Sequence, residues 1–446
     1  MSLENLKNRR ILTYTNVSEN DSFRARVSRR YWQLRASHPP IVILAYFAWR
    51  ISAKVAKNLT RTLATALKPP NRNTGHSVVN VSYPGVEPLE NTNTPLIFAL
   101  GIQGGIGDAL IAARFVRDLQ AYLNVDLQFD VFCKNQKIVE PFFEKIRGFR
   151  KTLDISILSD FNKYYTFTIK GGQYLLFIKE YMKFDKIFFN TTEMMQVYGN
   201  AQRARSDFDI YIKNEPYLDG AFADLMAPKG HKRYSYQQSI FGVPYQGHKL
   251  NLNISRGILE TFGLNHGQYL TIHDGWDEYF KISKSRPTKA VPVKFWSDLV
   301  AALKRTFPTL KIVQIGGKTG EDIPGVDINL KNQLSFDQST AILAGARLHF
   351  DCESGLVHLA ACLGVRSVVM FGPTNIDWFG YPENINIAPG QCGNCWWSTD
   401  TWMSQCPIGS KTPVCTDSYS IPYIIEQTKS ALKETKQEHY ANIRSV

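Results

Sequence analysis

The segment from Phe350 to Thr374 constrains the fold more than any other part of this chain. It reads as the end of a strand, a tight polar turn, a helix with apolar residues at helical spacing, and a second strand that ends in Gly-Pro-Thr. Glu353, Ser354 and Gly355 stand where the helix begins, and His358 lies one turn further on. Because the N–H groups at a helix start bind anions, this turn is a candidate phosphate site. An ordinary strand–helix unit with a packing glycine is the alternative.

A second strand–turn–helix segment lies far upstream, from Pro95 to Leu123. Leu96–Leu100 is a continuous apolar run that suits a buried parallel strand, and a glycine-rich turn separates it from a predicted helix over Ala109–Leu123. The turn lacks the G-x-G-x-x-G fingerprint of dinucleotide-binding proteins. Asp108 stands at the helix start, at the carboxyl end of the strand. It is placed either to cap the helix or to act as a general base.

Together the two segments resemble glycosyltransferase family 9, the heptosyltransferase-like enzymes of bacterial envelope synthesis. The Gly107-Asp108 pair is similar to the family's first strand–helix turn. ESGLVHLA, which begins at Glu353, resembles the family's Asp-Thr-Gly-x-x-His-Leu-Ala segment, and Phe-Gly-Pro-Thr follows it at Phe371 as in the family. Glu-Ser in place of Asp-Thr keeps the charge and the hydroxyl but lengthens the acid by one methylene. The resemblance covers about residues 95–430.

Two weaker matches follow in the family's order. Lys289 precedes Pro292 by three residues, as in the family's donor-phosphate region, and Glu321 lies near the place of the carboxylate on the donor ribose. A solvated loop residue is the alternative for Glu321. The resemblance implies an active site built from seven of the positions named so far, of which one, Asp108, would be the catalytic base. The other six would contact the donor: Lys289, Glu321, Glu353, Ser354, Gly355 and His358.

The activity that the resemblance implies is that of an inverting glycosyltransferase without a cofactor required for catalysis. The donor would be a nucleotide-diphosphate sugar, with ADP-heptose favoured, and the acceptor a hydroxyl of lipopolysaccharide or another envelope glycoconjugate. Family relatives that glycosylate autotransporter proteins make a protein acceptor an alternative. A non-catalytic protein that binds nucleotide sugars or glycans is a further alternative, against which the carboxylate of Asp108 argues.

Strand candidates alternate with helical patterns in both halves, which predicts an α/β fold with two parallel Rossmann-like sheets. The candidates after the first strand are Leu127–Phe132, Lys186–Phe189, Tyr269–His273, Lys311–Ile315, Leu348–Asp351 and Ser367–Phe371. The resemblance implies the GT-B architecture, in which two such domains face a cleft. We expect a basic helical extension and linker over 1–94, an acceptor domain over 95–265, a nucleotide-sugar domain over 266–420, and a closing helix and tail over 421–446.

The net charge of +13 is concentrated near the N-terminus. Residues 1–70 hold 13 lysines and arginines against three acids, and the apolar run Ile41–Trp49 is too short to span a bilayer. Residues 41–68 read as a basic amphipathic helix, which suits peripheral contact with an anionic inner membrane; packing on the protein's own first domain is the alternative. We expect a cytoplasmic protein, possessing no cleavable signal. No nucleic-acid-binding module is visible, so a nucleic-acid partner is not expected.

Four of the seven cysteines fall within a short loop, 392–415, with the spacing C-x2-C-x10-C-x8-C. Cys392, Cys395, Cys406 and Cys415 form a candidate four-thiolate site for a structural Zn or Fe ion, with free thiols or a redox pair as alternatives. The other three are predicted to be small core residues, namely Cys133, Cys352 and Cys362.

Overall fold

The computed structural model describes residues 96–124, 127–178, 191–255, 257–276 and 286–443. The chain divides into two compact units, residues 1–86 and 87–446, and all the described residues belong to the second unit. The predicted basic extension over 1–94, with its amphipathic segment 41–68, therefore lies outside the described residues. So does the predicted strand Lys186–Phe189.

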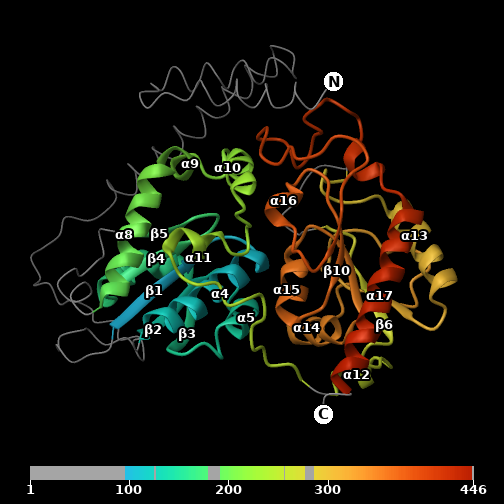
Figure 1. Cartoon of the computed structure of the whole chain (residues 1–446), viewed down its shortest axis with the longest axis horizontal. Coiled ribbons are helices and arrows are strands. Elements are labelled where there is room, and N and C mark those ends of the chain that lie inside the picture. Colours follow the sequence, from blue (N-terminus) through green and yellow to red (C-terminus); the bar gives the residue numbers. More distant parts are fainter. Residues whose placement is uncertain (1–95, 125–126, 179–190, 256, 277–285, 444–446) are drawn as a thin grey trace, which may run out of the picture. The chain divides into compact units, whose positions relative to one another are not determined.

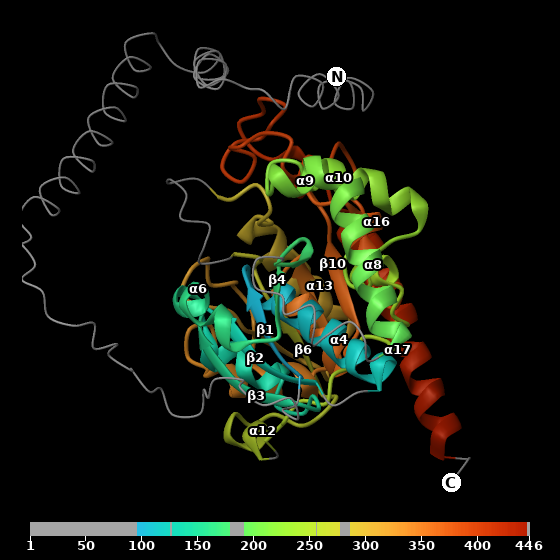
Figure 2. The ribbon, with the colours of Figure 1, turned by 90° about the vertical axis from the view of Figure 1, so that its left-hand side faces the viewer.

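The first half of the described chain is built on a five-stranded sheet with the order β3-β2-β1-β4-β5. In Figure 2 its strands β1, β2, β3 and β4 lie side by side. Four strands are parallel, as predicted, but β5 runs antiparallel to β4 because the short loop between them can only form a hairpin. The strands are β1 (Leu96–Ile102), β2 (Leu127–Cys133), β3 (Phe149–Asp154), β4 (Phe167–Gly171) and β5 (Leu175–Phe177).

The helix α4 (Ile106–Leu123) follows β1 and begins three residues earlier than predicted. Gly105 is its N-cap, so Asp108 is the third residue of the helix and not the cap itself. The remaining helices of this half are α5 (Gln136–Val139), η1 (Glu140–Phe142), η2 (Ile155–Ile157), α6 (Leu158–Phe161), η3 (Asn162–Tyr164), α8 (Thr192–Asp207), α9 (Asp209–Lys213), α10 (Asp219–Met226), η5 (Ala227–Lys229) and α11 (Tyr236–Phe241).

The second half is built on a six-stranded sheet with the order β11-β10-β9-β6-β7-β8, and every pair in it is parallel. Its strands are β6 (Tyr269–Ile272), β7 (Lys311–Gln314), β8 (Ile328–Asn329), β9 (Leu348–Cys352), β10 (Ser367–Met370) and β11 (Ile385–Ile387). Its helices are α12 (Ile258–Thr261), α13 (Val293–Thr306), α14 (Phe336–Gly345), α15 (Gly355–Leu363), α16 (Ile376–Phe379), η6 (Val414–Asp417) and α17 (Ile421–Ile443). The prediction of two Rossmann-like sheets is confirmed.

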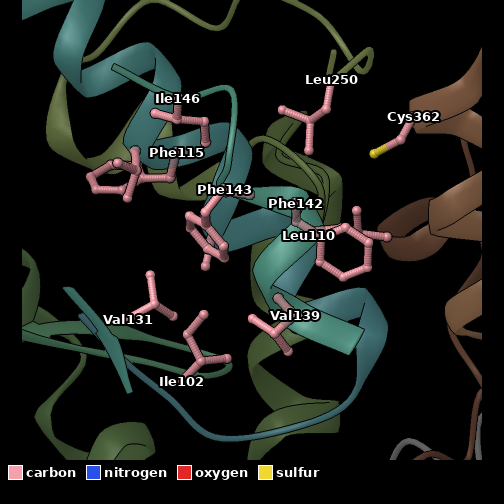
Figure 3. Packing of buried hydrophobic residues seen from close by; sticks show 14 of the residues in the cluster. Ile102, Leu110, Phe115, Val131, Val139, Phe142, Phe143, Ile146, Leu250 and Cys362 are labelled. Atoms are coloured by element: carbon pink, nitrogen blue, oxygen red, sulfur yellow. The ribbon is translucent and has the colours of Figure 1, made fainter. Parts of the chain in front are cut away.

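The two halves pack through α4 and α15, which lie between the two sheets (Figure 1). Leu110 of α4 and Leu359 of α15 belong to one buried apolar cluster. Cys362 also belongs to it and points from α15 towards residues of the first half (Figure 3). The predicted core positions of Cys133, Cys352 and Cys362 are confirmed, since all three are buried. Among the described residues, no helix is long and apolar enough to span a membrane.

Candidate functional site

The turn that carries Asp108 lies after β1, the strand at which the order of strands in the first sheet reverses. β1 has β2 on one side and β4 on the other, and ligands of such sheets bind beyond the carboxyl ends of the strands at this point. Gly104 has a φ of +129°, and a Cβ added there would lie 2.1 Å from Asp108 Oδ2. Only glycine therefore leaves room for the carboxylate. The N–H of Gly105 donates to Oδ2 at 3.2 Å, so Asp108 satisfies one of the free donors of the helix start.

The other oxygen of Asp108 is bound by Arg233. Nη2 of Arg233 donates to Oδ1 at 2.5 Å and to the carbonyl of Gly172 at 3.0 Å. The backbone N–H of Arg233 in turn donates to the carbonyl of Trp378 in the second half. Nη1 of Arg233 is buried and makes no hydrogen bond within the described part of the chain. Sequence reasoning missed Arg233, which lies in a stretch with little periodic pattern.

Two further carboxyl groups surround this arginine. Burial raises the pKa of Glu215, with Lys170 acting against the shift. Burial also raises the pKa of Asp219 to about 8; the charge of Glu215 adds to this, and Arg233 opposes it. The hydroxyl of Tyr174 donates to Asp219 Oδ1 at 3.3 Å. At neutral pH Asp219 therefore carries its proton, which limits the negative charge near Asp108.

In the second sheet the order of strands reverses between β6 and β9, and a hydrogen-bonded network lies at this point. Asp351 Oδ1 lies 2.9 Å from Nδ1 of His273, and Oδ2 lies 3.2 Å from Nε2 of His349. Burial acts to raise the pKa of Asp351, but the charge and hydrogen bond of His273 outweigh it and hold that pKa well below its ordinary value. The hydroxyl of Ser354 donates to the same carboxylate at 2.5 Å and accepts from the N–H of Leu356. Ser354 is thus the N-cap of α15, and its hydrogen bond to the Asp351 carboxylate holds its side chain in place.

Three of the predicted donor-binding residues meet at the start of α15. Nζ of Lys289 lies 2.6 Å from Glu353 Oε2, and Nε2 of His358 lies 3.9 Å from Oε1 of the same carboxylate. Burial lowers the pKa of His358 well below its ordinary value, and the cations Arg114, Arg233 and Lys289 lower it further. His358 is therefore uncharged at neutral pH. The neutral ring can offer one uncharged hydrogen bond, and the predicted contact of His358 with the donor phosphate stays a prediction.

The starts of α4 and α15 touch each other. A Cβ added to Gly107 would lie 2.7 Å from Cδ2 of His358, and one added to Gly355 would lie 3.2 Å from Cβ of Ile106. Two glycines thus allow the two helix starts to approach closely. The arrangement brings the Asp108 turn beside the turn of Glu353, Lys289 and His358, although the two turns come from different halves of the chain.

Comparison with known proteins agrees with the sequence motifs. Residues 285–402 match the family model described as glycosyltransferase family 9 (heptosyltransferase). The resemblance to this family is confirmed. The chain is an enzyme of the glycosyltransferase class, and the matched segment contains the strand β9, the start of α15 and the Gly-Pro-Thr that follows β10.

Several solved structures are similar to this glycosyltransferase, whereas no curated protein sequence matches it. The ADP-heptose LPS heptosyltransferase II of E. coli is 15% identical, over 76% of this chain and 99% of that one, with a TM-score of 0.45. A glycosyltransferase family 9 protein of Veillonella parvula is 13% identical, over 76% and 97%, with a TM-score of 0.45. The iron-containing dodecameric glycosyltransferase TibC of enterotoxigenic E. coli is 16% identical, over 76% and 78%, with a TM-score of 0.46.

Glu321 of the glycosyltransferase lies in the loop after β7, and its side chain is exposed. Its backbone N–H donates to Asp274 Oδ2 at 2.7 Å, and Asp274 Oδ1 lies 3.7 Å from Nε2 of His273. The loop of Glu321 is therefore tied to the residues after β6 by a hydrogen bond from its backbone to the Asp274 carboxylate. The predicted contact of its carboxylate with a ribose stays a prediction.

The four cysteines of the loop 392–415 lie near one another. Burial raises the pKa of the Cys415 thiol, and the neighbouring Cys395, Cys392 and Cys406 raise it further. A hydrogen bond also joins Cys392 to Cys415. Across the described ranges, however, no group of three or more His, Cys, Asp or Glu side chains has the arrangement of a formed metal site. The donor set suits a soft ion, whereas the positions of the thiols are not those of a closed coordination shell.

Proposed function

We propose that this enzyme is an inverting glycosyltransferase that moves a heptose from a nucleoside diphosphate, with ADP-heptose as the favoured donor, to a hydroxyl of an envelope glycoconjugate. The observation that carries the proposal is the contact between the two helix starts, which places the Asp108 turn against His358. A base and an anion-binding turn within one site are what such a transfer requires.

In the reaction the acceptor hydroxyl oxygen forms a bond to the anomeric carbon while the bond from that carbon to the diphosphate oxygen breaks. The diphosphate leaves with the electron pair, and the hydroxyl proton passes to a carboxylate oxygen of Asp108. One lone pair on each oxygen is occupied, by Gly105 N–H and by Arg233, and a carboxylate has room for more partners. About a third of the Asp108 side chain is exposed, so an acceptor hydroxyl can reach it.

The departing diphosphate carries negative charge, and the groups at the start of α15 suit it. Lys289 supplies a cation, the helix start supplies N–H groups, and His358 supplies a neutral donor. Glu353 binds Lys289 through Oε2, and its Oε1, which lies 3.9 Å from Nε2 of His358, can accept from sugar or ribose hydroxyls. These assignments require no metal ion at the diphosphate, and they agree with the family match over residues 285–402.

The acceptor is either a glycolipid, with the lipopolysaccharide inner core as the favoured class, or a protein. A cytoplasmic enzyme that contacts the inner membrane through residues 41–68 would favour the glycolipid. The four cysteines would hold one structural Zn or Fe ion when metal is supplied, because four thiolates are the set that such ions select. Neither assignment enters the transfer step.

A ligand screen by thermal shift tests the proposal. ADP-heptose should raise the melting temperature more than UDP-sugars or GDP-sugars, because only a ligand of the native site stabilises the fold. Mass spectrometry of acceptor mixtures should then detect addition of one heptose in the presence of that donor. A protein that binds ADP-heptose tightly but transfers nothing to lipopolysaccharide or protein acceptors would be a binding protein, and the transferase proposal would fail.

A further inference from the structure

A chain of hydrogen bonds runs from Arg114 through Tyr381 to His358. Nη1 of Arg114 lies 2.7 Å from the hydroxyl oxygen of Tyr381, and that oxygen lies 2.7 Å from Nδ1 of His358. All three side chains are almost completely buried. Arg114 belongs to α4 in the first half, whereas His358 belongs to α15 and Tyr381 follows α16.

The direction of these bonds follows from what each group can donate. A guanidinium has no acceptor, so Arg114 donates and the Tyr381 oxygen accepts. The phenol keeps its single proton at neutral pH, because burial raises the pKa of Tyr381 to about 12. That proton is buried and needs an acceptor, and within the described part of the chain the only one in reach is Nδ1 of His358. Nδ1 therefore accepts, and the proton of the neutral imidazole lies on Nε2.

The protonated Nε2 faces the site. It lies 3.9 Å from Glu353 Oε1, and a Cβ on Gly107 would lie 3.3 Å from it. We infer that Arg114 and Tyr381 are positioning residues that hold His358 as the neutral Nε2–H tautomer, so that it presents one uncharged hydrogen-bond donor to the anionic group of the substrate at the start of α15. This inference rests on the proposed function for the identity of that anion, but not for the state of the ring.

Several contacts fix the two positioning residues. Nε of Arg114 donates to the carbonyl of His248 at 2.7 Å, and Nη2 donates to the carbonyl of His358 at 3.1 Å and to Sγ of Cys362 at 2.8 Å. The ring of Tyr381 stacks on that of Tyr234 with 4.5 Å between centroids. Since Arg114 comes from the other half of the chain, the tautomer of His358 depends on the packing of the two halves.

The ring state can be read by 15N NMR of the full-length protein with 15N-labelled histidine, because protonated and unprotonated ring nitrogens have well-separated shifts. The His358 signals are assigned by their loss in His358→Gln. In the wild type without ligand we expect Nε2 protonated and Nδ1 unprotonated at neutral pH. A ring protonated on Nδ1, or on both nitrogens, would overturn the inference whether or not ADP binds.

Tyr381→Phe removes only the hydroxyl and should release the ring into a mixture of tautomers. ADP affinity, measured by calorimetry, should fall by about 2- to 10-fold, because only a fraction of the rings would then carry the proton on Nε2. Tyr269→Phe is the matched control: Tyr269 is equally buried, but its hydroxyl donates to the carbonyl of Ile342 away from the site. It should change neither the His358 signals nor ADP affinity.

The two proposals fail in different ways. A mixed tautomer in Tyr381→Phe with unchanged ADP affinity would overturn the binding role of the ring. A wild type that has the expected tautomer but does not bind ADP would leave the ring assignment standing and overturn the donor class.

Discussion

Arg233 donates to Asp108 across 2.5 Å, and the arginine side chain is only 3% exposed whereas that of the aspartate is 34% exposed. The ion pair therefore has one buried member and one that substrate can reach. Because the guanidinium is permanently charged, it fixes the orientation of the carboxylate without competing for a proton. Arg233 also holds the carbonyl of Gly172, so the position of Asp108 is tied to the hairpin of β4 and β5.

Replacing Asp108 by Asn should lower kcat by about 10²–10⁴-fold while ADP affinity stays nearly unchanged. The amide keeps the shape of the side chain but cannot take the acceptor's proton. Steady-state transfer assays and calorimetry measure the two quantities. If Asp108→Asn keeps more than about a tenth of the wild-type rate, the carboxylate serves only the helix start.

Asp108→Asn also leaves Arg233 without its ion pair, so a second variant separates orientation from proton transfer. Arg233→Lys keeps the charge but cannot bind both Asp108 and Gly172 from one planar group. We expect a smaller fall in kcat than in Asp108→Asn. Arg117→Lys is the control, because Arg117 forms a similar pair with Asp118 at 2.7 Å on the same helix.

Gly107→Ala should damage the site through packing alone. The added Cβ would lie 2.7 Å from a ring carbon of the buried His358, so the two helix starts must move apart. Displacement of a catalytic group by a fraction of an ångström should lower kcat/KM by about 10- to 100-fold. Gly105→Ala, where the new methyl meets no atom of the described residues within 4 Å, should have little effect. Equal activity of the two variants would show that the close approach of the helices does not matter.

The parts of this site that could be predicted from the sequence are those encoded by consecutive residues. Local sequence pattern predicts both the strand–turn–helix at Ser354 and the turn at Asp108. The start of α4 was misplaced because Gly107 reads as a turn residue, whereas its lack of a side chain serves the contact with His358. Its role depends on a residue of the other half, which no local pattern reveals.

The residues that orient the predicted ones could not be found in this way. Arg233 and Asp108 are 125 positions apart, and Arg114 and Tyr381 are 267 apart. Arg114 reads as an ordinary polar position within an apolar helix, and its burial becomes visible only when α15 packs against α4. The lowered pKa of His358 could not be predicted either, because it is set by burial and by cations that the fold brings together.

Lys289→Ala should weaken ADP binding more than the loss of one contact would suggest. The lysine is 2.6 Å from the buried carboxylate of Glu353, so its removal leaves that negative charge facing the diphosphate. Loss of a charged hydrogen bond worth about 1.5–3 kcal/mol corresponds to about 10- to 150-fold in Kd by calorimetry. Lys294→Ala, which removes an exposed ion pair with Asp298, is the control. Unchanged affinity in Lys289→Ala would place the donor elsewhere.

Protein purified without chelator should contain about one Zn or Fe per chain by elemental analysis if the four thiols hold a structural ion. Cys395→Ser should lose that metal and unfold at a lower temperature, with activity falling only as the loop loosens. Cys133→Ser, in the core of the first half, should keep the metal. Folded, active and metal-free wild-type protein would identify the four as ordinary thiols.

The pH dependence of the free energy of unfolding should reveal the titration of Asp219. Its pKa is raised from 3.8 to about 8 in the folded protein, so between these values the native state holds a proton that the unfolded chain has released. The contribution of Asp219 to the free energy of unfolding is therefore fully present below about pH 4, and it is lost as the pH rises towards about pH 8. The slope should approach about 1.4 kcal/mol per pH unit in urea unfolding experiments.

Asp219→Asn should flatten that slope between about pH 4 and about pH 8, since the amide cannot titrate. Asp160→Asn, at an exposed position, should leave it unchanged. The charge of Asp108 contributes to the raised pKa of Asp219, so Asp108→Asn should shift the loss of stability to lower pH. Identical profiles for the wild type and Asp219→Asn would mean that Asp219 is ionised in the native protein, and the site would then carry one more negative charge beside its proposed base.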